Sequence, residues 1–312
     1  MMNILVTGAN GQLGRSLRYA ARNDKENTWF WTDVAGIEGV RCEYLDITDL
    51  EAVKKFFVDN SISVCINCAA YTNVDGAETD KEKAQALNAD APKNLAEACL
   101  IHGAKLIHIS TDYVFNGLSF MPLTEDRATF PTSVYGKTKL EGEQNIINSG
   151  CKYLIFRTAW LYSEYGNNFV KTIMKLVKDK DEISVVDDQI GTPTYARSLA
   201  EFIYQLIDQV FPLQKEGIYH FTNDGVCSWF DFACLIRDCV AEHIKGDVSL
   251  AAVKAINTKD FYGDKPHAPR PYYSVLNKNK LKTDFGFVGD NWMYFVERCI
   301  GNIMGENREN YE

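Results

Sequence analysis

A tyrosine and a lysine stand four residues apart in the sequence, at Tyr135 and Lys139. On a helix two such positions share one face, so we expect the phenol and the ammonium to lie side by side. A neighbouring positive charge favours the phenolate, and we therefore expect the pKa of Tyr135 to fall below its ordinary value of about 10. The pattern predicts a general acid usable near neutral pH; the alternative is a surface pair without a catalytic role.

Two hydroxyl residues, Ser110 and Thr111, directly follow a predicted strand over Lys105–Ile109. In a parallel sheet the ligands bind at the carboxyl ends of the strands, where these hydroxyls are expected to lie. Such a hydroxyl can hydrogen-bond a carbonyl oxygen next to the phenol of Tyr135. The sequence therefore predicts that these separate segments meet at one site.

Glycines at positions 8, 11 and 14 lie where a predicted strand, Asn3–Thr7, gives way to a predicted helix, Leu13–Ala21. Gly8, Gly11 and Gly14 let the backbone turn tightly, approach a pyrophosphate and place that anion at a helix N-terminus. By itself this spacing is also compatible with an ordinary loop between a strand and a helix.

Two aspartates strengthen the prediction of a dinucleotide site. Asp33 ends the second predicted strand, where a carboxylate can accept from the ribose 2′-hydroxyl of an adenosine, and Asp46 follows the third strand, within reach of the adenine. The charge of Asp33 disfavours a 2′-phosphate, but Arg15 or Arg41 can offset it. We therefore expect NADPH or NADH without choosing between them.

Short apolar runs alternate with helical patterns through the first half of the chain, which is typical of β-α-β units and a parallel sheet. The fold class predicted is α/β, a Rossmann-type doubly wound parallel sheet with a smaller C-terminal substrate domain. The other predicted strands are Thr28–Thr32, Arg41–Leu45, Val64–Cys68 and Tyr153–Thr158, and the other helices are Leu50–Asn60, Glu82–Ile101 and Val134–Asn148.

The regular pattern ends near Trp160. We predict an NAD(P)-binding domain over residues 1–160, followed by a mainly substrate-binding domain over 161–312 that is interleaved with the last strands of the sheet. Helices are expected there at Asn168–Lys178, Arg197–Val210 and Trp229–His243.

The composition of the chain argues against several classes of partner. The 312 residues carry 33 basic and 42 acidic side chains, a net charge of −9, without a basic cluster, which argues against nucleic acid. No apolar run approaches the length of a membrane span. The nine cysteines are scattered singly, and we interpret them, including Cys65 and Cys68, as buried residues of a cytoplasmic protein. The five histidines lack metal-ligand spacing, so no metal is predicted.

Several motifs together resemble the dTDP-4-dehydrorhamnose reductases, a family of the extended short-chain dehydrogenase/reductase superfamily. The resemblance covers most of the chain, and its motifs stand in the family's order. They are Gly11–Gly14, Ser110–Phe115, Tyr135–Glu143, Arg157–Tyr162 and Asp188–Thr194, with Arg270, Pro271 and Ser274 beyond them.

The resemblance implies NAD(P)H-dependent reduction of the C4 keto group of dTDP-4-dehydro-L-rhamnose to dTDP-L-rhamnose. It implies Tyr135 as proton donor, Lys139 as the residue that holds the nicotinamide ribose, and Thr111 as the residue that orients the keto oxygen. Cofactor positions are Gly8, Gly11, Gln12, Leu13, Gly14, Asp33, Asp46, Ile47, Ala69, Ala70, Tyr71, Tyr135 and Lys139; substrate positions are Thr111, Asp112, Tyr113, Trp160, Asn168 and Arg270.

Alternatives stay open at this point. The same fold carries nucleotide-sugar epimerases and dehydratases, and relatives without catalytic activity serve as regulatory subunits of methionine adenosyltransferase. Some family members hold magnesium at a dimer contact through a carboxylate on the first helix, where this chain has Arg15 and Ser16. The sequence therefore argues against that metal and leaves a homodimer open.

Overall fold

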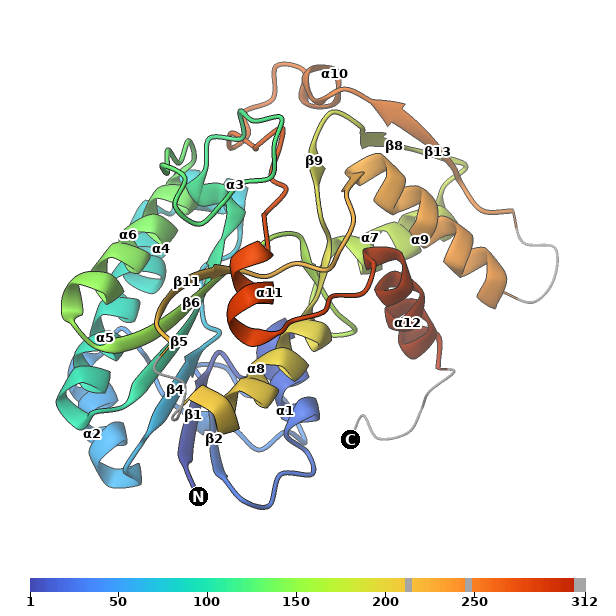
Figure 1. The fold of residues 1–312 in the computed structure, drawn as a ribbon. Helices are drawn as coiled ribbons and strands as arrows, with labels where there is room; N and C mark the ends of the chain where they lie inside the picture. The colour runs from blue at the N-terminus through green and yellow to red at the C-terminus, as the bar shows by residue number, and fades with distance from the viewer. Residues whose placement is uncertain (211–214, 245–248, 306–312) are drawn as a thin grey trace.

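The computed structural model describes residues 1–210, 215–244 and 249–305. Its centre is a seven-stranded parallel sheet with the strand order β11-β6-β5-β4-β1-β2-β3 (Figure 1). This confirms the predicted Rossmann-type fold. The strands are β1 (Asn3–Thr7), β2 (Thr28–Asp33), β3 (Glu43–Tyr44), β4 (Val64–Asn67), β5 (Lys105–Thr111), β6 (Lys152–Thr158) and β11 (Gly217–His220).

Helices cover both faces of this sheet because neighbouring strand residues point to opposite faces. Along β1, Ile4 and Val6 pack on one side, and Leu5 packs on the other. The first face is covered by α1 (Gln12–Ala20), α8 (Ala196–Val210) and α11 (Asn279–Phe285). The second is covered by α2 (Leu50–Asn60), α5 (Ala91–His102) and α6 (Val134–Ser149).

The helix predicted over Glu82–Ile101 is confirmed, and it contains one π-helical turn. The structure has α3 (Val74–Thr79), α4 (Lys81–Gln85), one π-helical turn, η1 (Ala86–Asp90), and then α5. The turn carries Asn88, whose Oδ1 accepts from the Tyr71 N–H at 2.9 Å and whose Nδ2 donates to the Tyr71 carbonyl at 3.1 Å. This tertiary contact ties the turn to the loop after β4, which helical periodicity cannot reveal.

A second hydrophobic core lies beyond Trp160. It is built from α7 (Phe169–Asp179), α9 (Trp229–His243), α12 (Trp292–Met304) and a parallel pair, β8 (Glu182–Val186) with β13 (Ala252–Ile256). The chain nevertheless returns to the sheet, because α8, β11 and α11 complete the core next to β1. The division of domains at residue 160 stays a prediction. No described helix is long and apolar enough to cross a bilayer.

Candidate active site

A cavity of about 650 Å³ lies at the carboxyl ends of the central strands. Residues from both hydrophobic cores line it. The predicted positions found in its wall are Gly8, Gly11, Gln12, Leu13, Asp33, Asp46, Ile47, Ala69, Ala70, Thr111, Asp112, Tyr113, Tyr135, Lys139, Trp160, Asn168 and Arg270. Gly14 and Tyr71 are not among the lining residues.

At Gly8 and Gly14, in the turn between β1 and α1, there is no room for a side chain. Gly8 has a φ of +65°, and a Cβ placed on it would stand 2.6 Å from the backbone nitrogen of Ala69. A Cβ on Gly14 would stand 2.4 Å from the Gly8 carbonyl oxygen, so this glycine sets how closely α1 packs on the turn. Gly11 is the N-cap of α1 and provides no side-chain cap. This cradle fits a dinucleotide pyrophosphate.

Backbone amides hold the two predicted adenosine-side carboxylates. Asp33 accepts from the N–H of Asn10 at 3.0 Å and from that of Val34 at 2.8 Å. Asp46 accepts from the N–H and the hydroxyl of Thr48, at 2.9 and 2.7 Å. Both carboxylates are therefore oriented at the cavity wall, and the bond to Asn10 joins Asp33 directly to the glycine turn.

Thr111 and Asp112 lie with Tyr135 in the lining of the cavity. The Thr111 hydroxyl donates to Asp112 Oδ1 at 2.9 Å and accepts from the N–H of Tyr113 at 3.2 Å. Burial raises the pKa of the Asp112 carboxyl to about 6. This carboxyl therefore titrates close to neutral pH, in the cavity that the phenol also lines.

The predicted lowering of the Tyr135 pKa is wrong for this structure. Burial raises the pKa of the phenol, and the charges of Asp112 and Tyr113 act in the same direction. The lysine does not offset this, because the Nζ of Lys139 donates to the Ile109 carbonyl at 2.6 Å. Spacing on a helix shows which residues are neighbours, and it does not show where a long flexible side chain points.

Lys139 is itself buried, and burial lowers its pKa to about 8. Glu143, one turn further along α6, opposes this shift. The carboxylate of Glu143 pairs with the Arg157 guanidinium through bonds of 2.9 and 2.7 Å and accepts from Ser110. Lys139 therefore lies buried in the cavity wall, where Glu143 only partly compensates its positive charge.

The Arg270 guanidinium reaches across the cavity and is already bonded. It donates to the hydroxyls of Tyr113 and Tyr262, at 3.2 and 2.8 Å, and to the carboxylate of Asp75. Burial raises the pKa of Tyr113 to about 12, so this phenol is a poor base. The arginine links the segment after α10 (Thr258–Tyr262) to α3 on the other side of the cavity.

Asn168 caps α7, and internal bonds occupy its side chain. Its Oδ1 accepts from the Lys171 N–H at 3.2 Å, and its Nδ2 donates to Gln12 Oε1 at 3.0 Å and to the Ser163 carbonyl at 2.7 Å. An anion at this position would face the first turn of α7, while the side-chain amide of Asn168 ties α7 to the cofactor turn. Sequence reasoning did not foresee the contact with Gln12.

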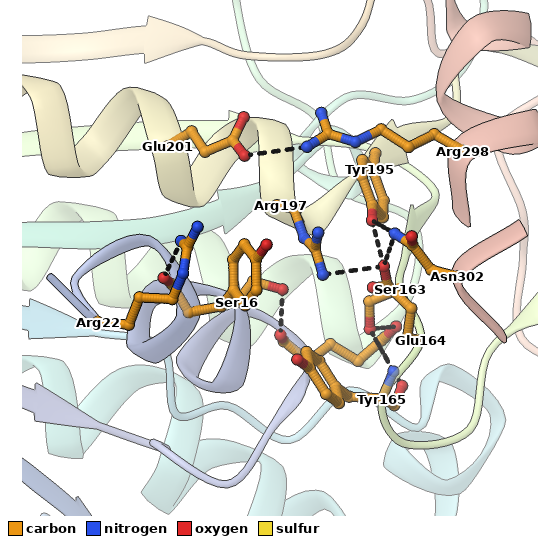
Figure 2. A network of polar contacts seen from close by, with 12 residues as sticks. Ser16, Arg22, Ser163, Glu164, Tyr165, Tyr195, Arg197, Glu201, Arg298 and Asn302 are labelled. Carbon is orange, nitrogen blue, oxygen red and sulfur yellow. Dashed lines mark hydrogen bonds and ion pairs between the residues drawn. The ribbon is translucent and has the colours of Figure 1, made fainter. Parts of the chain in front are cut away.

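The segment after β7 (Leu161–Tyr162) is anchored by a buried carboxylate, Glu164 (Figure 2). Glu164 accepts from the Tyr195 hydroxyl and from Asn302 Nδ2, and it pairs with Arg197 at 3.2 Å. These partners come from α8, α12 and the residue before α8, so the network fixes the wall that carries Asn168.

Two tryptophans form part of the cavity wall, and only one was predicted. Trp160 has a φ of +50°, and its ring stacks on Trp229 with centroids 3.7 Å apart. A Cβ on Gly191 would stand 2.7 Å from Cε2 of Trp160, so the absence of a side chain at Gly191 leaves room for the indole. Trp229 follows the N-cap Ser228, a signal for a helix start, but its place in the wall follows from tertiary packing.

Cys68, interpreted from the sequence as a core residue, also lines the cavity. At the place of the family's first-helix carboxylate, the Arg15 guanidinium lies over the Tyr165 ring, 4.1 Å from its centroid. Across the described ranges, no three His, Cys, Asp or Glu residues are grouped as metal ligands.

The sheet, the glycine cradle and the Thr111, Tyr135 and Lys139 wall define a nicotinamide-dependent oxidoreductase of the extended short-chain dehydrogenase/reductase fold. The family model described as the RmlD substrate binding domain matches residues 2–304. A dTDP-4-dehydrorhamnose reductase of Aggregatibacter actinomycetemcomitans is 38% identical over 306 residues, covering 97% of this chain and 98% of the relative.

Two solved structures are similar over almost the whole chain. A dTDP-4-dehydrorhamnose reductase of Clostridium acetobutylicum has a TM-score of 0.86 and 42% identity, covering 97% of this chain and 99% of its own. The enzyme of the same name from Bacillus anthracis, solved in complex with NADP, has a TM-score of 0.84 and 36% identity, covering 97% and 100%. The chain belongs to the dTDP-4-dehydrorhamnose reductase family.

Proposed function

We propose that this enzyme reduces the C4 keto group of dTDP-4-dehydro-L-rhamnose to give dTDP-L-rhamnose. The cofactor, NADPH or NADH, supplies the hydride when it is bound. The observation that carries the proposal is the convergence of Thr111, Tyr135 and Lys139 on one wall of a cavity whose other end holds the glycine cradle.

In this proposal Tyr135 gives its proton to the oxygen at C4 as hydride arrives at the carbon, so that the carbonyl becomes a secondary alcohol. The O–H bond of the phenol breaks and the O–H bond of the product forms. The raised pKa of Tyr135 keeps the phenol protonated, and hence able to donate, across the neutral range. Thr111 lines the same cavity as Tyr135 and would orient the keto oxygen.

We further propose that Asp112, Tyr113, Trp160 and Arg270 contact the sugar nucleotide and that the first turn of α7, behind Asn168, faces its diphosphate. A guanidinium fork and a helix N-terminus suit that anion. Arg270 would then exchange Asp75 for phosphate oxygens.

The chemistry of Tyr113 disfavours a dehydratase. Elimination of water from C5 and C6 needs a base for the C5 proton, and dehydratases of this superfamily resemble one another in placing Glu after the Thr-Asp pair. Here a phenol with a pKa of about 12 occupies that place. If the protein were instead a regulatory subunit, it would bind the cofactor without turnover, and incubation with the 4-keto sugar nucleotide and cofactor distinguishes that outcome from a reductase.

The residue assignment is tested by Tyr135→Phe. The variant should bind cofactor and unfold like the wild type, while turnover falls about 10²- to 10⁴-fold, as for a lost general acid. Cofactor oxidation with the 4-keto sugar nucleotide is the measurement, and Tyr44→Phe, an exposed position on β3, is the control. Turnover close to that of the wild type would remove Tyr135 from its role.

The reaction itself is tested in two incubations. With dTDP-glucose alone we expect no 4-keto-6-deoxy product, and with dTDP-4-dehydro-L-rhamnose plus NADPH or NADH we expect oxidation of the cofactor. Product in the first incubation would indicate a dehydratase. Cofactor binding without oxidation in the second would favour a regulatory subunit.

A further inference from the structure

A row of buried polar side chains crosses three neighbouring strands behind Lys139. Thr7 on β1 is the register partner of Asn67 on β4, and Asn67 is the register partner of His108 on β5. Register partners in a parallel sheet point to the same face, so the three side chains lie in one line. Each has at most 1% of its surface exposed.

The orientation of the Asn67 amide follows from its partners. One of its side-chain atoms accepts from the backbone N–H of Ala69 at 3.1 Å and from the Thr7 hydroxyl at 2.8 Å. A backbone N–H can only donate, so this atom is the oxygen. The Nδ2 of Asn67 therefore faces His108, where it stands 3.1 Å from Nδ1.

The tautomer of His108 follows in turn. Because Nδ2 of Asn67 can only donate, Nδ1 of His108 must present its lone pair. Burial, and then the charge of Lys139, hold the pKa of the imidazole well below its usual 6.5, so the ring is neutral and its proton is on Nε2. That Nε2 lies 3.4 Å from the Nζ of Lys139.

We propose that His108 is a positioning residue for Lys139, because its Nε2–H, aimed by Asn67 at Nζ, opposes the ammonium form of the lysine in the free enzyme. An N–H facing an ammonium sets two donors against each other, whereas an uncharged amine offers a lone pair. Hydroxyl oxygens of a bound ligand would accept from the ammonium and so raise the pKa of Lys139 above its value in the free enzyme. The identity of that ligand, the cofactor ribose, rests on the proposed function.

The other groups around Lys139 do not supply this effect. Glu143 on the same helix favours the ammonium, and it is itself paired with Arg157 of β6. Tyr135 stands one turn earlier on α6, and η1 brings the uncharged Asn88 against this helix. Apart from burial, the His108 N–H is therefore the contact that opposes the charge.

The test is His108→Asn, which keeps an acceptor near the place of Nδ1 for Asn67 and removes the Nε2–H. His220→Asn is the matched control, because His220 is also buried in this sheet, on β11, and bonds to the Leu123 carbonyl. Nitrogen-15 NMR of the imidazoles should find the His108 proton on Nε2 in the wild type. Titration of the Lys139 Nζ resonance should give a pKa near 8, raised by about one unit in His108→Asn and unchanged in His220→Asn.

A kinetic measurement distinguishes this role from a merely structural one. The basic limb of kcat/KM for the cofactor reports the free enzyme and should move upward by about one pH unit in His108→Asn, while the limb of kcat moves little. A proton on Nδ1 in the wild type, or an unchanged Lys139 pKa in the variant, would overturn the proposal. The NMR arms use the protein without substrate, so they decide the matter even if the proposed reaction is wrong. The tautomer measurement uses the wild type alone, and a proton on Nδ1 would overturn the proposal even if the variant did not fold.

Discussion

The buried carboxyl of Asp112 couples the site to the stability of the protein. Its pKa of about 6 in the folded chain lies above its ordinary value of 3.8, so between these pH values the folded state binds more protons than the unfolded state. Stability from this group is therefore present below about pH 4 and is lost as the pH rises through 6. The full loss is on the order of 3 kcal/mol.

We predict that Asp112→Asn stabilises the enzyme at pH 8 by about 1 to 3 kcal/mol and has little effect at pH 4. The amide oxygen still accepts from Thr111, and no buried charge remains. Denaturant unfolding of both proteins at the two pH values is the measurement. An equal change in the free energy of unfolding at both pH values would show that ionisation of the Asp112 carboxyl does not cause the effect.

Asp33 is expected to set the cofactor preference. We predict that Asp33→Asn shifts the affinity ratio toward NADPH, because it removes a negative charge near the 2′ position and keeps an acceptor for the Asn10 N–H. Titration of both cofactors against both proteins provides the ratio, and Asp46→Asn serves as the neighbouring control. An unchanged ratio would assign the discrimination to other residues.

At the residue scale, spacing and strand ends predicted that the glycine turn, Thr111 and the Tyr135/Lys139 pair gather in the cavity. Trp160, Asn168 and Arg270 were expected there only from the resemblance to the family. Spacing and strand ends did not predict ionisation: Tyr135 was expected to be acidified by Lys139, but burial raises its pKa. His108 and Trp229 were missed as well. Their importance depends on contacts between strands, or between the two cores, that no local pattern contains.

At the scale of elements, the packing of α1 on β1 depends on Gly14. Alanine is the better helix former by about 1 kcal/mol, so Gly14→Ala would be stabilising on an open helix. Here its Cβ would stand 2.4 Å from the carbonyl oxygen of Gly8 and 2.5 Å from the Cα of Ala9. Because both are backbone atoms, the helix or the turn must move.

We therefore predict that Gly14→Ala lowers the free energy of unfolding by about 1 to 3 kcal/mol and weakens cofactor binding at least tenfold. Gly36→Ala is the matched control, because a Cβ there meets nothing within 4 Å. Thermal unfolding and cofactor titration check both effects. If Gly14→Ala behaved like the control, the close approach of helix and turn would not matter for the site.

The elements that apolar periodicity assigned agree with the structure to within two residues, as for Asn3–Thr7, Leu50–Asn60 and Trp229–His243, but it assigned none of β8, β11, β13 and α12. It could not show the π-helical turn η1, where the side chain of Asn88 binds the backbone of Tyr71. It also overestimated the third strand, which pairs only through Glu43 and Tyr44.

At the scale of the whole molecule, the cavity depends on contacts between parts of the chain far apart in sequence. Gln12 in the cofactor turn bonds to Ser163 and Asn168, and Asp75 bonds to Arg270. The sequence predicted an interleaved second half, but not these connections, because they join side chains more than 140 positions apart. Movement of the second half relative to the sheet would therefore displace residues at both ends of the cavity.

The return of the chain to the sheet also has a consequence for how the protein is made. The edge strand β11 and the covering helix α8 come from beyond residue 195, and their side chains complete the core beside Ile4 and Val6. On the ribosome, the first 160 residues emerge with that face of the sheet only partly covered. The apolar surface of the nascent Rossmann half is therefore closed only after α8, β11 and α11 have followed, and in that interval it is a natural substrate for chaperones.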